Sequence, residues 1–296
     1  MKLSKLGEDR LLERLLPALP RNASVLAGAG DDCAVVRFRG ASELLVLKTD
    51  CVVQGIHFVK NAPARAVGWK AMARVLSDFA AMAAWPEFAL VTLLAPSATD
   101  AEWVEELYRG FGKAARAFGV AIVGGETSRT PGPLAISVAM TGHVEKDRWI
   151  SRRGGKAGDD LFVTGRLGGS LGGKHLRFQP RLQEARWLSE HFRVHAMMDL
   201  SDGLGADLPR LATASGVGFE IDRASLPRSR GCSVAQAIGD GEDYELLFAL
   251  IPRKRVALER KWKRAFPKLR LTHIGRLNQK SDIRNQKWPA GYDHFQ

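Results

Sequence analysis

The segment RRGGKAGD at residues 152–159 separates the 296-residue chain into two parts of similar length. Glycine and charged residues dominate this segment, which is typical of a connection between packed units. We therefore place a domain boundary just before it, near residue 147, and expect one domain over residues 1–146 and a second over residues 147–296. A chain of this length can form two modest domains, each with a core.

Helices and strands are mixed on both sides of this boundary. The hydrophobic pattern before it predicts helices at residues 7–16, 63–84 and 99–118, and strands at residues 33–36, 44–47, 88–94, 120–123 and 134–140. The pattern after it predicts helices at residues 181–191, 204–215 and about 253–264, and strands at residues 161–164 and 244–250. We expect the strand at 88–94 to be buried, and Thr99 to open a capping box with Glu102. This mixture indicates an α/β or α+β fold.

The composition is that of an ordinary globular protein, with 45% apolar and 26% charged residues. The sequence contains no apolar run of the roughly 18 residues that cross a bilayer. The first eight residues, MKLSKLGE, lack the apolar stretch of a signal peptide, so we expect a cytoplasmic protein. Cys33, Cys51 and Cys232 lie far apart, which argues against disulfides and structural zinc, and we expect Cys33 and Cys51 to be buried thiols.

The chain is basic, with a formal net charge of +12. A basic surface can attract nucleic acid, acidic lipid or small anionic substrates. The sequence has no zinc-finger or RRM pattern, and its basic residues gather at 177–181 and 253–264, where the second group resembles the solvated face of a helix. We therefore expect no nucleic-acid partner and no membrane partner.

Acidic side chains stand in apolar or glycine-rich surroundings at several places. They are Asp31, Asp32, Asp50, Asp78, Glu126, Asp199 and Asp202. An ionised carboxylate in such a setting costs several kcal/mol unless a cation, backbone N–H groups or a metal ion compensates it. Several acids at the ends of strands and loops suggest a shared divalent cation, and oxygen ligands favour Mg²⁺.

Each acid taken alone also has a structural explanation. Asp31 and Asp32 are common turn or N-cap residues. Asp78 could pair with Arg74 one helical turn away, and Asp202 could cap the helix that begins near Leu204.

Two glycine-rich stretches could bring backbone N–H groups close to a phosphate. They are Gly124-Gly125, after a predicted strand, and Gly168 to Gly173. The start of the helix at Leu204 could receive an anion in the same way. No GxxxxGK[ST] pattern occurs in the sequence, so these are not P-loops.

Eight short motifs, in order along the chain, resemble those of the thiamine-monophosphate kinase family. They are GDDCAVV (30–36), TD followed by QGIHF (49–58), LSDFAAMAA (76–84), GGETSR (124–129), SRRG followed by GDD (151–160), MDLSDGL (198–204), GEDYEL (241–246) and GYDHF (291–295). Each motif alone is unspecific, but the ordered combination is specific.

The resemblance implies a PurM-like architecture with an α+β N-terminal domain and an α/β C-terminal domain. It implies a homodimer formed through the N-terminal sheets, with ATP bound near the interface. It also implies the transfer of the γ-phosphoryl group of ATP to the phosphate of thiamine monophosphate, directly and with Mg²⁺, without a side-chain nucleophile.

The resemblance further assigns roles to individual residues. Metal ligands would be Asp32, Thr49, Asp50, Asp78, Glu126, Asp199 and Asp202. Residues that contact ATP would be Gly125, Arg152 and Ser201. Residues that hold thiamine monophosphate would be His57, Glu242 and Tyr292, with Trp288 as a rival for ring stacking.

The chain departs from the family pattern at four places. Glu126 replaces an Asp, Lys48 replaces a Ser or Thr, Asp240 replaces a Gly, and the stretch 173–181 is shorter than usual. These departures leave room for a related substrate or reduced activity. The alternatives are another PurM-like enzyme acting on a related phosphorylated substrate, and a non-catalytic basic binding protein on the same scaffold.

Overall fold

The computed structural model describes residues 2–20, 22–38, 40–279 and 291–292. Its first sheet has six strands in the order β1-β2-β3-β6-β4-β5. These are β1 (Val25–Ala27), β2 (Ala34–Arg37), β3 (Glu43–Val53), β4 (Trp85–Ala95), β5 (Ala121–Arg129) and β6 (Ala135–Glu145). The helices of this part are α1 (Leu3–Leu6), α2 (Glu8–Leu15), α3 (Ala64–Ala81) and α4 (Ala101–Phe118).

The second sheet has five antiparallel strands in the order β8-β10-β7-β11-β9. They are β7 (Asp160–Thr164), β8 (Ala196–Asp199), β9 (Gly218–Ile221), β10 (Leu246–Leu250) and β11 (Leu271–Asn278). The helices of this part are α5 (Leu182–His191), α6 (Leu204–Ser215), α7 (Val234–Gly239) and α8 (Arg255–Ala265). The expected mixed α/β fold is confirmed, although the sequence pattern did not predict β1, β8, β9, α7 or β11.

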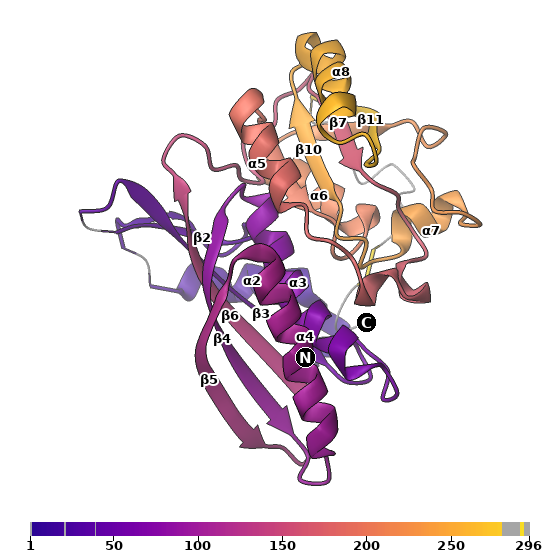
Figure 1. Ribbon diagram of the computed structural model, residues 1–296. Helices are drawn as coiled ribbons and strands as arrows, with labels where there is room; N and C mark the ends of the chain where they lie inside the picture. The colour runs from indigo at the N-terminus through magenta and orange to yellow at the C-terminus, as the bar shows by residue number, and fades with distance from the viewer. Residues whose placement is uncertain (1, 21, 39, 280–290, 293–296) are drawn as a thin grey trace.

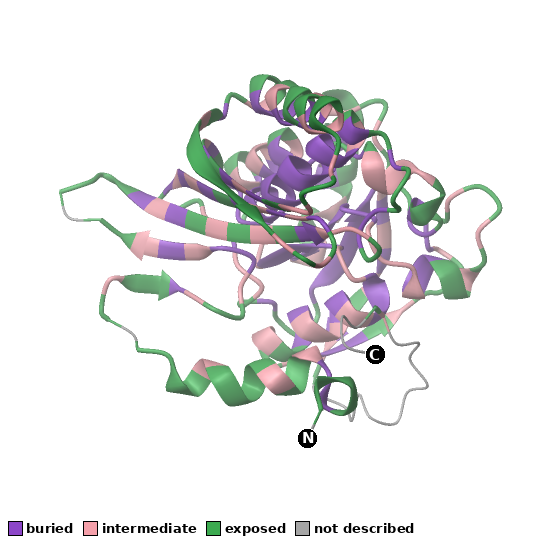
Figure 2. Ribbon diagram, turned by 90° about the horizontal axis from the view of Figure 1, so that it is seen from below, coloured by how far each residue is buried: buried purple, intermediate pink, exposed green. Residues whose placement is uncertain are grey.

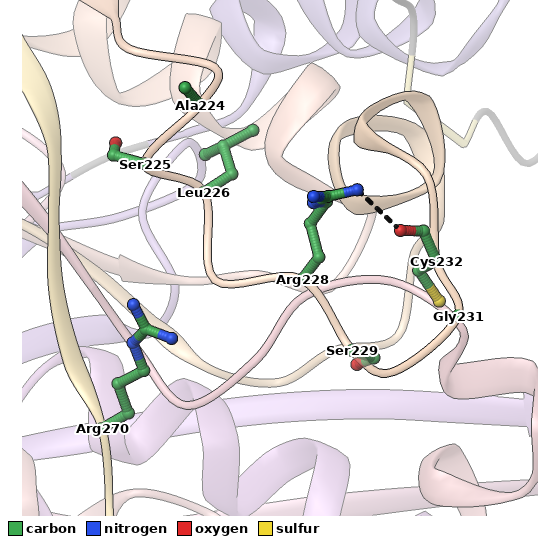
Figure 3. Close-up of a pocket in the computed structure, with 8 residues that line it drawn as sticks. All are labelled: Ala224, Ser225, Leu226, Arg228, Ser229, Gly231, Cys232 and Arg270. Carbon is green, nitrogen blue, oxygen red and sulfur yellow. Dashed lines mark hydrogen bonds between the residues drawn. The ribbon is translucent and has the colours of Figure 1, made fainter.

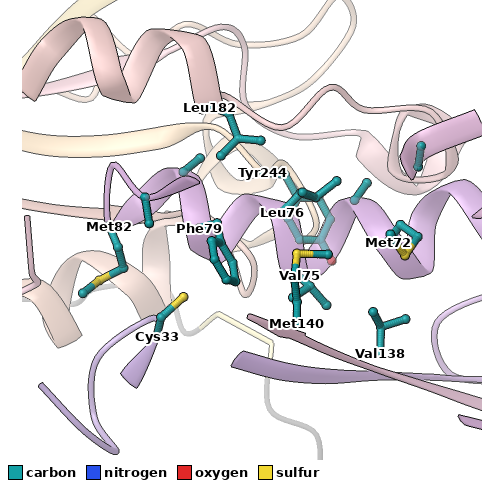
Figure 4. Packing of buried hydrophobic residues seen from close by; sticks show 14 of the residues in the cluster. Cys33, Met72, Val75, Leu76, Phe79, Met82, Val138, Met140, Leu182 and Tyr244 are labelled. Atoms are coloured by element: carbon teal, nitrogen blue, oxygen red, sulfur yellow. The ribbon is translucent and has the colours of Figure 1, made fainter. Parts of the chain in front are cut away.

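Helix α3 lies at the centre of the molecule. It packs with α4 on one face of the six-stranded sheet (Figure 1). In the main hydrophobic core, its Met72 and Phe79 lie between Met140 of β6 on one side and Leu182 and Tyr244 of the second part on the other (Figure 4). All its residues except Arg65 and Ala66 are buried. Side chains of α3 therefore reach both parts of the protein.

The opposite face of the six-stranded sheet is open, and the prediction of a buried strand at 88–94 is wrong for this face. Strand β4 alternates, because Ala89, Val91 and Leu93 are buried whereas Phe88 and Leu90 are 49% and 48% exposed. Figure 2 shows such alternation along the long strands. A strand that is covered by helices on one face only buries every second residue.

The same alternation corrects the expectation for one cysteine. Cys33 is buried, but Cys51 is exposed because it lies on the open face of β3.

Two strands are longer than predicted, and this changes where candidate residues lie. Strand β3 continues to Val53, so Asp50 lies inside the strand, and β5 includes the Gly124-Gly125 pair. A Cβ atom on Gly125 would lie 1.8 Å from the carbonyl oxygen of Val91, so the close approach of β4 and β5 requires glycine here.

Helix ends also differ in detail from the prediction. The N-cap of α4 is Asp100, not Thr99, and its carboxylate accepts a hydrogen bond from the Glu102 N–H at 2.8 Å. Helix α6 begins at Leu204 as predicted and contains Pro209. Among the residues that the structure describes, no helix is both long and apolar enough to cross a membrane.

Candidate active site

Three of the predicted metal ligands form one cluster. Asp32 precedes β2, Asp78 lies on α3, and Asp199 ends β8, so three separate elements supply the cluster. All three are buried, and one carboxylate oxygen from each lies within 4.8 Å of the other two. Residues far apart in sequence thus form a candidate cation site.

The electrostatics of this acid cluster favour a cation. Burial, followed by the charge of Asp32, raises the pKa of Asp199 to about 7. Burial also raises the pKa of Asp78, and Lys48, at 3.0 Å, only partly offsets this. Oδ2 of Asp32 is buried and has no hydrogen-bond partner among the described residues. A divalent ion with oxygen ligands would satisfy that atom and relieve the mutual repulsion.

Hydrogen-bond donors and basic side chains contact each carboxylate of the acid cluster. The Arg152 guanidinium donates to Oδ1 of Asp32 at 2.7 Å, and the Ser77 hydroxyl donates to Asp199 at 2.5 Å. Lys48, which departs from the family pattern, pairs with Asp78. Arg152 was predicted from the resemblance, whereas Ser77 was not.

Asp50, whose charge acts on Asp78, and Asp202 are both paired with arginines. The Arg74 guanidinium donates to both Asp50 oxygens, from Nε at 2.8 Å and from Nη2 at 3.2 Å. Asp202 pairs with Arg210 and does not cap α6, whose N-cap is Gly203. The single-residue explanations of Asp78 and Asp202 are therefore wrong, because Arg74 pairs with Asp50 instead of Asp78 and Gly203 is the N-cap of α6.

The remaining metal-ligand candidates, Thr49 and Glu126, lie elsewhere. Adjacent residues of a strand point to opposite faces, so Thr49 points to the open face while Asp50 points towards the helices. Glu126 pairs in register with Thr92 on the open face of β5. Strands β3 and β5 are separated by β6 and β4, a distance of roughly 14 Å at the usual strand spacing. Within one chain, Gly125 and Glu126 are thus remote from the acid cluster.

A cavity of about 90 Å³ gathers the predicted substrate residues. His57, Glu242 and Tyr292, from three separate motifs, line it together with Ser201 and Asp202 from a fourth. Its wall also contains residues that were not predicted, namely Ile56, Arg74, Leu171, Gly241 and Tyr244. Arg74 and Tyr244 could have been suspected, since both lie within or beside the motifs. Trp288 and the last three residues of the GYDHF motif lie outside the described residues.

Glu242 is surrounded by nitrogen atoms of basic side chains. The buried Lys70 contacts its carboxylate, and Nδ1 of His175 lies 2.9 Å from its Oε2. Lys70 also donates to the His57 carbonyl oxygen at 2.5 Å. Hydrogen bonds from His175 and Lys70 outweigh burial and lower the pKa of Glu242, which therefore stays ionised. His175 comes from the shortened stretch 173–181, so that short loop reaches this cavity.

The backbone beside the cavity is strained, and hydrogen bonds hold it in place. Glu242 and Tyr244 adopt φ angles of 63° and 51°, a region that non-glycine residues seldom occupy. Between them, Asp243 accepts hydrogen bonds from the Ser170 hydroxyl at 2.5 Å and the Gly168 N–H at 2.9 Å. Such strain persists where the surroundings hold it, and it often marks a functional site. The Gly168 N–H is thus bound to a carboxylate, which weakens the phosphate-loop interpretation of this segment.

A larger hollow of about 620 Å³ lies elsewhere in the second part of the protein. It is formed by the segment from Ala224 to Cys232, with Arg270 facing it from the other side (Figure 3). None of the predicted site residues lines it, so its size alone does not connect it with the acid cluster.

Comparisons with known proteins identify similar chains. The family described as AIR synthase related protein matches with its N-terminal domain at residues 30–144 and its C-terminal domain at residues 149–276. A thiamine-monophosphate kinase of Rhodopirellula baltica is 40% identical over 79% of each chain. One of Aquifex aeolicus is 32% identical over the whole of both chains. The solved structure of AaThiL complexed with AMPPCP and TMP has a TM-score of 0.85, with 31% identity and 99% of each chain covered.

Proposed function

The chain belongs to the thiamine-monophosphate kinase family, and from this premise we propose that it transfers the γ-phosphoryl group of ATP to the phosphate of thiamine monophosphate. The products are ADP and thiamine diphosphate. The observation that carries the proposal is the acid cluster of Asp32, Asp78 and Asp199 beside a cavity lined by His57 and Glu242. Because the reaction uses ATP, we place the enzyme in the cytoplasm.

Mg²⁺ fits the acid cluster, since three buried carboxylates and an unsatisfied Asp32 oxygen face one another. When bound, Mg²⁺ would neutralise phosphate charge and orient the phosphates for in-line transfer. Asp50 and Asp202 are ligand candidates at the edge of this site, where each now pairs with an arginine.

Different side chains would bind ATP and thiamine monophosphate. Arg152, next to Asp32, and Ser201, in the cavity wall, are positioned to bind the phosphates of ATP. The ionised Glu242 offsets the positive thiazolium ring, and Tyr292 offers a ring for stacking. Phosphoryl transfer depends mainly on such positioning and charge neutralisation, so no nucleophilic side chain is needed.

We further propose that two copies associate through the open face of the six-stranded sheet. Exposed apolar side chains gather there: Leu47, Phe88, Leu90, Leu94 and Val123. An apolar patch on a protein surface commonly marks an interface. Thr49 of β3 and Glu126 of β5 lie on the same face, and Gly125 is next to Glu126 in β5. We assign all three to the interface, where they serve the nucleotide site of the facing copy.

We retain the division into domains of residues 1–146 and 147–296 as part of this proposal. The first sheet ends at Glu145 and the second begins at Asp160, which supports a boundary between them. The first domain would carry the dimer face and most of the Mg²⁺ and ATP site, to which the second domain would add Asp199, Arg152 and Ser201.

The test is an assay of purified full-length protein with MgATP and thiamine monophosphate, in which ADP and thiamine diphosphate are measured. Activity should disappear when Mg²⁺ is chelated, and Mg²⁺ should raise the melting temperature of the wild type. Turnover of other phosphorylated acceptors but not of thiamine monophosphate would refute the assignment.

The oligomeric state is tested by light scattering, which should report a dimer for the wild type and a monomer for Leu90→Asp. A wild-type monomer with full activity would refute the dimer.

A further inference from the structure

Arg74 occupies the boundary between the acid cluster and the substrate cavity. It projects from α3, which also carries Asp78 one helical turn further on. Its guanidinium lines the cavity, and its side chain is only 10% exposed. Through its pair with Asp50, whose charge acts on Asp78, Arg74 connects the cavity with the acid cluster.

Part of the Arg74 guanidinium is already fixed, and part is not. Nε and Nη2 donate to the two oxygens of Asp50, which holds the planar group in one orientation. Nη1 lies 3.9 Å from Oε1 of Glu242, beyond hydrogen-bonding distance. Nη1 has no hydrogen-bond partner among the described residues, so its two N–H groups remain available beside the cavity.

The carboxylate of Glu242 already has other hydrogen-bond partners. Its Oε2 contacts Lys70 Nζ and lies 2.9 Å from His175 Nδ1. The cavity wall thus offers two kinds of recognition at neighbouring points, a carboxylate for a cation and guanidinium N–H groups for an anion.

We propose that Arg74 binds the phosphate group of the acceptor substrate and makes the site select the phosphorylated over the unphosphorylated compound. A guanidinium matches phosphate oxygens in geometry and charge. Because Asp50 holds Arg74 in place, little side-chain freedom is lost on binding. The proposal rests on the proposed function, because it names the residue that recognises the acceptor phosphate in that reaction.

The experiment compares the binding of thiamine monophosphate and of thiamine to the full-length protein by calorimetry, with Mg²⁺ and AMPPCP present so that no turnover occurs. We expect the wild type to prefer the phosphorylated compound. Arg74→Met should reduce this preference by about 10- to 100-fold, the effect of one or two charge-assisted hydrogen bonds, and should leave thiamine binding within about threefold. Arg74→Lys should restore part of the preference.

Arg276→Met is the matched control, because Arg276 pairs with Asp160 and belongs to β11, away from the cavity. This variant should keep the wild-type preference. If Arg74→Met weakens the binding of thiamine monophosphate and of thiamine equally, Arg74 only joins Asp50 to Glu242, and the proposal is overturned. If Arg74→Met does not fold, the Arg74→Lys variant decides. Lysine cannot bind a phosphate through two parallel N–H groups, so its preference for the phosphorylated compound should fall below that of the wild type. An unchanged preference would also overturn the proposal.

Failure of the proposed function gives a different result. A wild-type protein that binds thiamine monophosphate more tightly than thiamine, yet forms no thiamine diphosphate in the assay, would refute the kinase assignment and leave the role of Arg74 in phosphate recognition standing.

Discussion

Helices α3 and α4 have the same length, 18 residues, and pack against each other on one face of the six-stranded sheet, but they are buried to different extents. Helix α4 buries five residues, all on the face towards α3 and the sheet, and leaves its charged side chains in water. Helix α3 buries every residue except Arg65 and Ala66, including Lys70, Arg74 and Asp78.

The difference shows how a charged residue should be interpreted in each helix. A charge on α4 costs little because water solvates it, so it carries little information about function. A charge on α3 must be compensated by a partner or a ligand. Lys70 contacts Glu242, Arg74 contacts Asp50, and Asp78 contacts Lys48. These pairs lie along one stripe of α3 and connect the cavity with the acid cluster.

The largest effect is expected from Asp78→Asn. Removal of this carboxylate from the acid cluster should lower kcat/KM by about 1,000-fold, or roughly 4 kcal/mol of transition-state stabilisation. The metal-free protein should change little in stability, because the removal of a costly buried carboxylate is offset by the loss of its pair with Lys48. Steady-state assays and thermal melting, each with and without Mg²⁺, measure the two effects. An Asn variant with wild-type activity would remove Asp78 from the site.

The contact between the two helices should be sensitive to a single methyl group. A Cβ atom on Gly68 of α3 would lie 2.2 Å from the carbonyl oxygen of Leu107 on α4, so Gly68→Ala should lower the free energy of unfolding by about 3 kcal/mol. At Gly112 of α4, a Cβ atom would meet only the flexible Arg116 side chain, at 3.2 Å. Gly112→Ala is the control and should be neutral or stabilising by up to about 1 kcal/mol. Urea denaturation of both variants measures these changes, and equal stability would contradict the close packing.

Lys70 should act on substrate binding more than on turnover. Lys70→Met removes the contact that holds Glu242 and the His57 carbonyl together, so KM for thiamine monophosphate should rise about tenfold while KM for ATP and kcat change by less than threefold.

The same residue predicts a pH dependence. Burial lowers the pKa of Lys70 to about 8, against opposing effects of Glu242, so its positive charge is lost as the pH rises through that value. In the wild type, KM for thiamine monophosphate should therefore rise above pH 8, whereas in Lys70→Met it should not change over that range. A pH profile that is the same in both proteins would show that the Lys70 charge does not matter.

The smallest effect is expected on α4. Arg109 is exposed and pairs with Glu105 and Glu106 on the helix surface. Arg109→Ala should change the free energy of unfolding by less than about 0.5 kcal/mol and leave activity unaltered, since exposed ion pairs are weak and screened. Chemical denaturation and the kinase assay measure both. A large loss would mean that exposed charges of α4 are as important as the buried charges of α3.

Much of the fold and part of the site could be predicted from sequence. The hydrophobic pattern predicted both long helices and most strands of the first sheet, because periodicity depends on neighbouring residues. Ordered motifs indicated Asp32, Asp78, Asp199, His57 and Glu242, which the structure brings to one region. The pattern failed for the exposed apolar residues of β4, since a sequence does not state which face of a sheet remains uncovered.

The sequence by itself determined which residue types are present and most of the local elements they form: a long helix that carries Lys70, Arg74 and Asp78, apolar strands, and acids flanked by glycine or apolar residues. Only the tertiary structure decided which charges meet. Arg74 could equally have paired with Asp78, one turn away on its own helix, but it faces Asp50 on β3 and the cavity beside Glu242. The reason is physical, because Coulombic and hydrogen-bonding partners are chosen by distance in space, and that distance is set by how α3 packs between two sheets.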